Sequence, residues 1–210
     1  MINQHKSSTK EHIKLEYQAI LDLIPYGSTV LDLGCGGGEL LSLLVEKKGA
    51  EGRGIEINEQ AIYKCVSRGL SVSHQDIDAG LSEYGDKSFD YVILNQSLQQ
   101  VINLGLVLGE SMRVGRKVIV GFPNFAYYKA RLQIFISGKT PVTPSLPYMW
   151  YDTPNLHFLS ISDFIEYCRE KNLNIEKTVF LDKNRRVRLF PNLFAQVGIF
   201  LLSNRGASQK

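Results

Sequence analysis

The sequence is short of cysteine, of net charge and of long apolar runs. Its 210 residues include only three cysteines, and no two of them form a CxxC pair. This argues against a disulfide framework and favours a reducing, cytoplasmic compartment. The formal net charge of +3 is far below that of a nucleic-acid-binding module. The late apolar stretch 197–202 is too short to cross a bilayer, so neither nucleic acid nor membrane is an expected partner.

Other absences limit the chemistry. His5, His12 and His74 show no metal-ligand spacing with Cys, Asp or Glu, so no metal is expected. A Gly-x-Ser-x-Gly nucleophile elbow is missing, which argues against acyl transfer by this chain. The amino-terminal residues are polar, and no apolar core follows them as it would in a signal peptide.

The residues that are present alternate between strand and helix patterns. Apolar runs predict strands at 29–33, 52–57, 70–74, 89–95 and 116–121, and helical spacing predicts helices at 8–23, 39–48, 58–68 and 98–112. Two later strands, near 175–181 and 196–202, are joined too closely for a crossover helix, so they form an antiparallel pair at the sheet edge. The sequence thus predicts an α/β fold, a Rossmann-like doubly wound sheet of about seven strands, mostly parallel.

The regular pattern breaks after residue 123. Helices are predicted at 127–136 and 162–171, and a proline-rich aromatic insertion lies between them at about 138–157. We expect residues 1–210 to form a single domain that carries this insertion. Long loops usually serve a function, so the insertion is interpreted as an acceptor-pocket lid, a partner-docking surface or a hydrophobic plug on the sheet edge. His157 within it is either a structural or a catalytic histidine.

A second irregular feature is the basic cluster at 183–188. It is interpreted as a solvated turn between two strands, since charge runs usually mark exposed faces. The alternative is a site for an acidic partner or a phosphate.

The strongest motif follows the first predicted strand. Residues 30–38 are Val-Leu-Asp-Leu-Gly-Cys-Gly-Gly-Gly. Glycines there let the chain turn into a helix while the backbone approaches a ligand closely, and parallel sheets bind ligands at this end of their strands. Glu56 ends the second predicted strand, where a carboxylate accepts hydrogen bonds from both ribose hydroxyls of an adenosine.

Acidic residues around this loop distinguish two kinds of ligand. A dinucleotide fingerprint needs a third glycine where this chain has Glu39, and Asp32 adds a second carboxylate. Two anions at close range repel a pyrophosphate, whereas S-adenosylmethionine carries a sulfonium and an ammonium and no phosphate. We therefore predict S-adenosylmethionine, or S-adenosylhomocysteine, as the cofactor in preference to a nicotinamide.

The same motif resembles that of class I S-adenosylmethionine-dependent methyltransferases. The resemblance covers residues 29–121 approximately. Glu56 resembles the ribose-binding acid of that superfamily, and Asp76 resembles its adenine-binding position. The implied cofactor-binding residues are Asp32, Gly34, Cys35, Gly36, Gly38, Glu56, Ile57, Asp76, Ile77 and Asn95.

A narrower resemblance covers most of the chain. It rests on segments that are not general methyltransferase features: Asp78-Ala-Gly-Leu81, Met112-Arg-Val-Gly-Arg116, Phe122-Pro-Asn-Phe125, Leu146-Pro-Tyr-Met-Trp-Tyr-Asp-Thr-Pro-Asn155 and Pro191-Asn-Leu193. Together with the glycine loop they resemble the bacterial methionine biosynthesis protein MetW family. The sequence departs from that pattern at Gly37, where an acid is expected. The resemblance implies a role in methionine synthesis alongside a homoserine O-acyltransferase.

Two functions stay open, with a nicotinamide-dependent enzyme as a weaker third. The first is a subunit that binds S-adenosylmethionine and supports the acyltransferase; no catalytic residue is assigned to it. The second is a methyltransferase acting on a small molecule. Gln96 and Gln99, just past the fourth predicted strand, are neutral and are not strong bases. Methyl transfer can proceed mainly by alignment of the reacting groups, so the lack of a base does not exclude catalysis.

Overall fold

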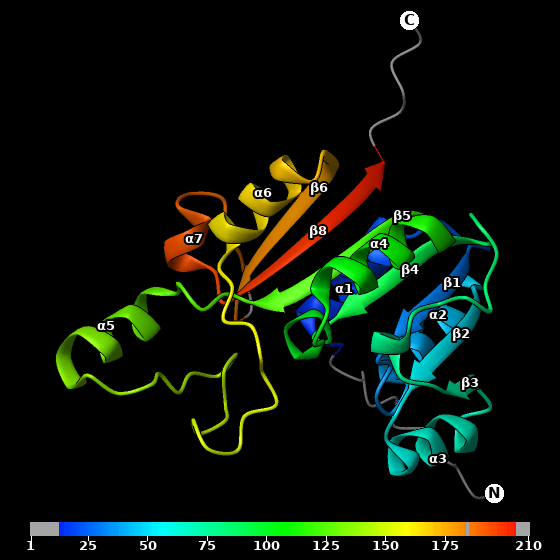
Figure 1. The fold of residues 1–210 in the computed structure, drawn as a ribbon, viewed down its shortest axis with the longest axis horizontal. Helices are drawn as coiled ribbons and strands as arrows, with labels where there is room; N and C mark the ends of the chain where they lie inside the picture. Colours follow the sequence, from blue (N-terminus) through cyan, green and yellow to red (C-terminus); the bar gives the residue numbers. More distant parts are fainter. Residues whose placement is uncertain (1–12, 184, 205–210) are drawn as a thin grey trace, which may run out of the picture.

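The chain folds around one mixed sheet, which confirms the predicted α/β class. The computed structural model describes residues 13–183 and 185–204, so the predicted helical residues 8–12 lie outside the described part. Eight strands lie in the order β3-β2-β1-β4-β5-β8-β6-β7 (Figure 1). The first five in that order pair in parallel.

The parallel half of the sheet follows the sequence prediction to within about two residues at each end. Its strands are β1 (Thr29–Leu33), β2 (Glu51–Glu56), β3 (Ser71–His74), β4 (Phe89–Asn95) and β5 (Gly115–Pro123). Its first crossover helices are α2 (Glu39–Lys48) and α3 (Glu59–Ser67). Local signals explain this agreement. Gly49 ends α2 in a left-handed conformation, and the Asn58 side chain caps α3 by accepting from the Ala61 amide at 3.0 Å.

Helices cover both faces of the sheet. On one face, α1 (Leu15–Leu23) and α2 pack their buried leucines and isoleucines against strand residues such as Val30, Ile93 and Ile199. On the other face, α4 (Leu104–Val114) and α6 (Ile161–Glu170) pack against residues such as Leu33 and Val120. The central strands are therefore apolar on both sides, as expected for a doubly wound sheet.

The predicted C-terminal antiparallel pair is present, and it extends the edge of the parallel strands beyond β5 as expected. β6 (Leu173–Asp182) pairs antiparallel with β8 (Val197–Asn204), and β8 itself pairs with β5. Burial explains the order. Residues 198–202 of β8 are buried, so β8 fits between two strands, whereas β6 is mostly exposed or half-buried. The strand count is eight because β7 (Arg185–Arg186) adds a short outer bridge.

The segment predicted as one helix over 98–112 is broken. A single 3₁₀ turn, η2 (Leu98–Gln100), precedes α4. The Asp78 carboxylate accepts hydrogen bonds from the Ile102 and Asn103 amides, and the Asn103 side chain accepts from the Leu106 amide at 3.1 Å. These contacts end one turn and start a new helix, because they satisfy amides that a continuous helix would use.

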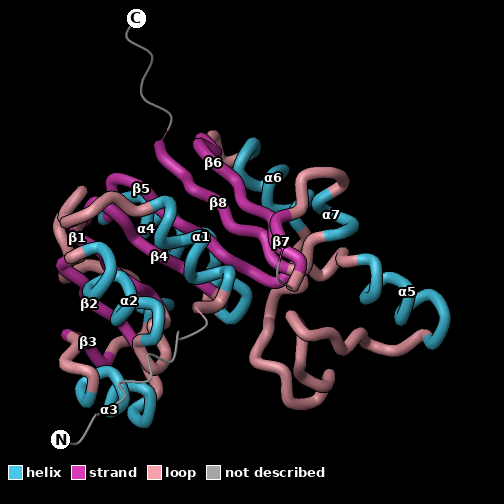
Figure 2. Tube along the Cα trace, turned by 180° about the vertical axis from the view of Figure 1, so that it is seen from behind, coloured by secondary structure: helices cyan, strands magenta, loops and turns pink. Residues whose placement is uncertain are grey.

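In the C-terminal part of the chain, α6 begins at Ile161, one residue before the predicted start, and its cap is Ser160. Ser160 and Asp163 exchange hydrogen bonds of 3.2 and 2.8 Å in a capping box. α5 (Tyr128–Ser137) and the loop 138–157 project from the body of the molecule in both views (Figure 1, Figure 2). A short helix, α7 (Pro191–Phe194), leads into β8.

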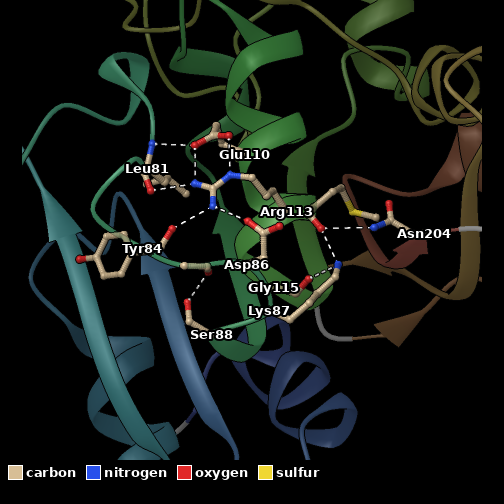
Figure 3. Close-up of polar contacts among 11 residues, drawn as sticks. Leu81, Tyr84, Asp86, Lys87, Ser88, Glu110, Arg113, Gly115 and Asn204 are labelled. Atoms are coloured by element: carbon tan, nitrogen blue, oxygen red, sulfur yellow. Dashed lines mark hydrogen bonds and ion pairs between the residues drawn. The ribbon is translucent and has the colours of Figure 1, made fainter.

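Two of the family-typical segments meet at the amino ends of β4 and β5 (Figure 3). Arg113 donates to both carboxylate oxygens of Glu110 at 2.8 Å, to Asp86 at 2.9 Å and to the carbonyls of Tyr84 and Leu81. We call these residues the Arg113 cluster. All three guanidinium nitrogens of Arg113 donate hydrogen bonds, so this cluster joins α4 to the turn before β4.

Another pair of family-typical segments meets at the carboxyl end of β5. The Asn124 side chain is fully buried. It donates to the carbonyls of Asn192 and Ala195 at 3.0 and 2.8 Å, and it accepts from the Ala126 amide at 3.1 Å. These hydrogen bonds hold the family-typical segments 122–125 and 191–193 against each other.

Candidate functional site

The glycine loop connects β1 to α2 with three left-handed residues. Gly34, Gly36 and Gly38 have φ values of 71°, 54° and 74°, a region that L side chains rarely adopt. A Cβ on Gly38 would lie 2.5 Å from Leu70, and one on Gly34 would lie 2.9 Å from Ser97. A Cβ on Gly36 would meet nothing within 4 Å. Gly34 and Gly38 are thus needed for packing, whereas Gly36 borders open space.

Glu56 at the end of β2 holds the loop from the side. One carboxylate oxygen accepts from the Gly36 amide at 2.8 Å. The other accepts from the amides of Ile57 and Asn58 at 2.9 and 2.8 Å. A carboxylate fixed by three amides beside the glycine loop has the position and charge to accept hydrogen bonds from ribose hydroxyls.

A cavity of about 310 Å³ lies over the loop; we call it the glycine-loop pocket. Five of the predicted site residues line it: Asp32, Gly34, Cys35, Gly36 and Asn95. Asp32 forms its floor and is only 3% exposed. No hydrogen bond to the Asp32 carboxylate is found within the described ranges. A buried carboxylate with no donor is costly unless a ligand supplies one.

The ionisation of Asp32 reflects this environment. Burial raises the pKa of Asp32 to about 7, and the neighbouring Glu56 carboxylate adds to the effect. The Cys35 thiol lies beside it, and burial together with Asp32 raises the pKa of that thiol above its ordinary range. Cys35 is therefore protonated and unreactive. Its sulfur packs against Gly54, where a Cβ would lie 2.5 Å away, so its role is to fit a narrow space.

The other predicted site residues lie outside this cavity. Glu56, Ile57, Asp76 and Ile77 follow the ends of β2 and β3, and Gly38 caps α2. Ile57 is 59% exposed. Asp76 is exposed, and its carboxylate accepts from the Asp78 amide at 2.9 Å as the cap of a 3₁₀ turn, η1 (Ile77–Ala79). The roles of these residues towards ribose and adenine stay predictions.

One wall of the pocket was not predicted. Lys14, Glu16 and Tyr17, at the start of α1, face the glycine loop across the cavity. Lys14 forms an ion pair with Glu39 at 3.1 Å, and the Tyr17 hydroxyl bonds the same carboxylate at 3.2 Å. Glu39 lines the pocket as expected, but its charge is paired, so repulsion of a pyrophosphate falls mainly to Asp32. No sequence pattern marks this wall, since it depends on how α1 packs.

The Gly37 position, where the family pattern has an acid, also borders the pocket. Its carbonyl accepts a hydrogen bond from the Arg68 guanidinium. A Cβ there would lie 3.5 Å from the Lys64 side chain, so an acid at this position would face two cations.

A second, larger cavity of about 650 Å³ adjoins the first; we call it the amide pocket. The two cavities share Lys14, Glu16 and Gln96 in their walls. Its amide side chains are Gln96, Gln99, Gln100, Asn155 and Gln196. The aromatic loop closes one side with Pro144, Ser145, Pro147, Tyr148 and Asn155. The insertion therefore reaches the ligand end of the sheet.

The contacts of the aromatic loop, residues 138–157, test its three interpretations. Its end is tied to η2, because the Gln99 carbonyl accepts from the Leu156 and His157 amides at 2.9 and 3.0 Å. The His157 ring bonds the Val101 carbonyl at 3.0 Å, which fits the structural reading of that histidine. Trp150 is 73% exposed, so a hydrophobic plug does not describe the loop tip.

The described arginines of the basic cluster agree with its first interpretation, a solvated segment between two strands. Arg185 and Arg186 are exposed and form the short strand β7 between β6 and β8, and the Arg186 guanidinium pairs with Asp22 on α1 at 2.7 Å. Arg185 pairs with Asp182 at 3.4 Å. Within residues 13–183 and 185–204, no group of three or more Cys, His, Asp or Glu side chains is arranged to hold a metal ion. Over the same residues, no helix has both the length and the apolar character to span a membrane.

Comparison with solved structures gives the fold. A structure from Thermotoga maritima, described as an S-adenosylmethionine-dependent methyltransferase and possible histamine N-methyltransferase, aligns with a TM-score of 0.65. It covers 90% of this chain and 88% of its own, at 19% identity. The fold is therefore the Rossmann-like fold of these methyltransferases.

Comparison of sequences gives a narrower result. The 2-phytyl-1,4-naphtoquinone methyltransferase of Thermosynechococcus vestitus is 29% identical over 48% of this chain and 49% of its own length. The bifunctional methionine biosynthesis protein MetXA/MetW of Rhodopirellula baltica is 36% identical over 86% of this chain and 30% of its own length. The chain thus spans half or less of these relatives. The family described as methionine biosynthesis protein MetW matches residues 14–202, and the chain belongs to that family.

Proposed function

We propose that this protein binds S-adenosylmethionine or S-adenosylhomocysteine and supports a homoserine O-acyltransferase in methionine synthesis. The observation that carries the binding part is the buried Asp32 carboxylate, which lines the glycine-loop pocket without a donor of its own. The open space beside Gly36 supplies the close approach that such a ligand needs.

The residues fit the parts of this cofactor in order along the sheet. Asp32 would accept from the ammonium of its amino-acid portion, and the Gly36 backbone would lie against it. Glu56 would accept from the ribose hydroxyls. Ile57, Asp76 and Ile77 lie where the adenine would follow. When bound, S-adenosylmethionine supplies an electrophilic methyl group on a sulfonium.

The direct test of this part is calorimetry on the full chain. Saturable binding of S-adenosylhomocysteine, with weak or no binding of NAD, is the expected result. Tight NAD binding without S-adenosylhomocysteine binding would overturn the proposal.

The acyltransferase part rests on family membership and on a missing motif. The chain has no Gly-x-Ser-x-Gly elbow, so acyl transfer would be done by the partner. The relative from Rhodopirellula baltica joins MetXA and MetW in one bifunctional protein, which supports contact between two such proteins. Co-purification with the homoserine acyltransferase from the same cell, followed by acyltransferase assays with and without this chain, tests it.

The partner contact is proposed for the aromatic loop. Trp150 and Tyr151 are 73% and 68% exposed, and exposed Trp and Tyr are the residues most often found as anchors in interfaces. Pro147 and Pro154 restrict the loop and so lower the entropy lost on docking. Trp150→Ala should therefore reduce acyltransferase association in a pull-down, because truncating such an anchor costs about 2 kcal/mol or more.

The matched control is Tyr63→Ala, which removes an equally exposed aromatic side chain from α3. It should leave association unchanged. S-adenosylhomocysteine affinity of Trp150→Ala should stay within about twofold, since the residue lies outside the glycine-loop pocket. Normal association of Trp150→Ala together with normal thermal stability would rule out this surface.

A methyltransferase acting on a small molecule is the second candidate function. It is favoured by the amide pocket, which adjoins the glycine-loop pocket proposed for the cofactor. A methyl acceptor would be identified by formation of S-adenosylhomocysteine in assays that contain no acyltransferase. Acyltransferase support without such turnover would favour the first function.

A further inference from the structure

The amide pocket holds polar groups that the proposed cofactor does not use. Gln99 is only 3% exposed and lines this pocket, and its Oε1 has no hydrogen-bond partner among the described residues. The other end of the same amide is fixed, because Nε2 donates to the Gln96 carbonyl at 2.9 Å. A buried acceptor without a donor costs about 1–3 kcal/mol, so a ligand that supplies the donor would be stabilised there.

A carboxylate lines the same pocket. Glu16 on α1 accepts from the Gln96 side-chain amide at 2.9 Å. The Gln96 backbone has a left-handed conformation, with φ of 61°, and its backbone N–H donates to the Gly121 carbonyl at 2.8 Å. Burial raises the pKa of Glu16, opposed by its hydrogen bonds. A cationic donor in the pocket would satisfy both Glu16 and Gln99.

The remaining walls provide donors for an anion. Asn155 is buried, and its side chain borders the pocket. Lys14 lies at the boundary with the glycine-loop pocket, where it already pairs with Glu39. Lys183 lies on another wall of the cavity. The pocket therefore offers acceptors around Glu16 and donors around Lys183 and Asn155.

The size and polarity of the pocket limit its ligand. A cavity of about 650 Å³ has the size of a small-molecule site and is too small for a polymer. Its five amide side chains disfavour a purely apolar ligand, and the Glu16 carboxylate disfavours a phosphate placed beside it. A small molecule that carries both an ammonium and a carboxylate satisfies all of these groups.

We propose that the amide pocket binds a small α-amino acid, with its ammonium on Glu16 and Gln99 and its carboxylate towards Lys183 and Asn155. This site adjoins the one proposed for S-adenosylmethionine and shares the Glu16 wall with it, and it does not require that cofactor to be bound. It serves either proposed function, as an acceptor site or as a site that senses an amino acid.

The test is calorimetry and ligand-observed NMR on the full chain with the standard L-amino acids and L-homoserine as probes. At least one probe should bind saturably. Its N-acetyl derivative, which lacks the ammonium, and its methyl ester, which lacks the carboxylate, should each bind about tenfold more weakly or worse. Absence of saturable binding by every probe at millimolar concentration would overturn the proposal.

Three variants locate the bound probe. Glu16→Gln keeps the size of the side chain and its bond from Gln96, and it should weaken the amino acid about tenfold. Lys183→Asn suits the left-handed backbone at this position, with φ of 44°. It should weaken the amino acid but not its methyl ester. Lys139→Asn, at an exposed lysine outside this pocket, is the matched control and should change nothing.

The glycine-loop pocket must also be excluded as the place of binding. Asp32→Asn should leave amino-acid affinity within about threefold, because Asp32 lines only the other cavity. Loss of binding in Asp32→Asn with normal binding in Lys183→Asn would place the probe in the glycine-loop pocket and overturn the proposal. S-adenosylhomocysteine is titrated in parallel on the same samples, so failure of either proposal is seen separately.

Discussion

Two polar clusters lie at opposite ends of the central strands, and they differ in how fully their polar atoms are partnered. At the amino ends of β4 and β5, Arg113 makes five hydrogen bonds to Glu110, Asp86 and two carbonyls. At the carboxyl ends, Asn95 and Gln99 each bury an oxygen that has no hydrogen-bond partner among the described residues, and the buried Asp32 carboxylate lines the glycine-loop pocket. Buried polar groups are normally satisfied, so the incomplete end is the one arranged for a ligand.

The segments typical of the family have two different roles, which are to hold the fold together and to line a ligand pocket. The segments around Leu81 and Arg113 are joined to each other by hydrogen bonds within the protein. The glycine loop and the aromatic loop border the two cavities whose walls include the unpartnered oxygens of Asn95 and Gln99. Changes at the incomplete end should therefore alter ligand affinity with little effect on stability, and changes at the Arg113 cluster should do the reverse.

The largest loss of affinity is expected for Gly36→Val. The new side chain would enter the open space of the glycine-loop pocket, and binding of S-adenosylhomocysteine should be abolished in calorimetry. The left-handed φ of 54° adds strain of about 1–3 kcal/mol, so the midpoint of thermal unfolding should fall modestly. Gly138→Val is the matched control, with φ of 63° and open space around its Cβ. It should show the same strain and unchanged binding; global unfolding of Gly36→Val alone would mean that Gly36 is only a turn former.

A smaller but still large loss is expected for Glu56→Ala. It removes the carboxylate proposed for the two ribose hydroxyls, and the affinity for S-adenosylhomocysteine should fall by about 2–4 kcal/mol in calorimetry. Glu51→Ala, at the other and exposed end of β2, is the control and should bind normally. An unchanged dissociation constant for Glu56→Ala would show that Glu56 does not bind ribose.

The third prediction concerns pH. The pKa of Asp32 is raised to about 7 by burial and by Glu56, so the folded state holds a proton that the unfolded state has lost. Between about pH 4 and pH 7, the contribution of Asp32 to the free energy of unfolding should fall as pH rises. A ligand ammonium prefers the ionised form, so affinity should instead rise with pH and level off above about pH 7.

Asp32→Asn checks both trends. Calorimetry across this pH range should show a flatter affinity profile than that of the natural protein, and denaturant unfolding should show a flatter stability profile. Identical profiles for the two proteins would mean that Asp32 does not titrate in this range.

The smallest change in affinity is expected for Arg113→Ala. The variant leaves the carbonyls of Leu81 and Tyr84 without their donor, so its midpoint of thermal unfolding should fall clearly. Its S-adenosylhomocysteine affinity should stay within about twofold, because the two ends share no contacts. Arg116→Ala removes a single exposed ion pair with Asp90 at 3.5 Å and should lower the midpoint less. A large loss of affinity in Arg113→Ala would remove the distinction between the two ends.

The same contrast explains what the sequence could predict. β1, α2 and β4 have the predicted bounds because continuous apolar runs and glycine signals act locally. The break before α4 was missed, since it depends on Asp78 bonding amides 24 and 25 residues away. Which strand of the C-terminal pair lies beside β5 was not predicted, although the unbroken apolar run of β8 differs from the half-exposed pattern of β6.

At the site, the glycine loop itself was predictable, and its opposite wall was not. Asp32, Gly34, Cys35, Gly36 and Asn95 line one cavity, as the motif suggests. Glu16 and Lys14 complete that cavity only because α1 packs across the sheet against β8 and α2. No sequence motif near residue 16 indicates this packing of α1, so the place of the Glu16 carboxylate between the two pockets could be found only from the fold.

The position of β8 has a consequence for how the protein is made. The strands β1 to β5 can pair with one another as soon as they leave the ribosome, and they contain the whole glycine loop. β6 joins the parallel strands through β8, which follows the other described strands in the chain. The amide pocket includes Leu181, Gln196 and Val197, so it cannot close until translation has passed residue 197. A nascent chain would therefore form the glycine loop well before the amide pocket, whereas the α1 wall of the glycine-loop pocket would also await β8.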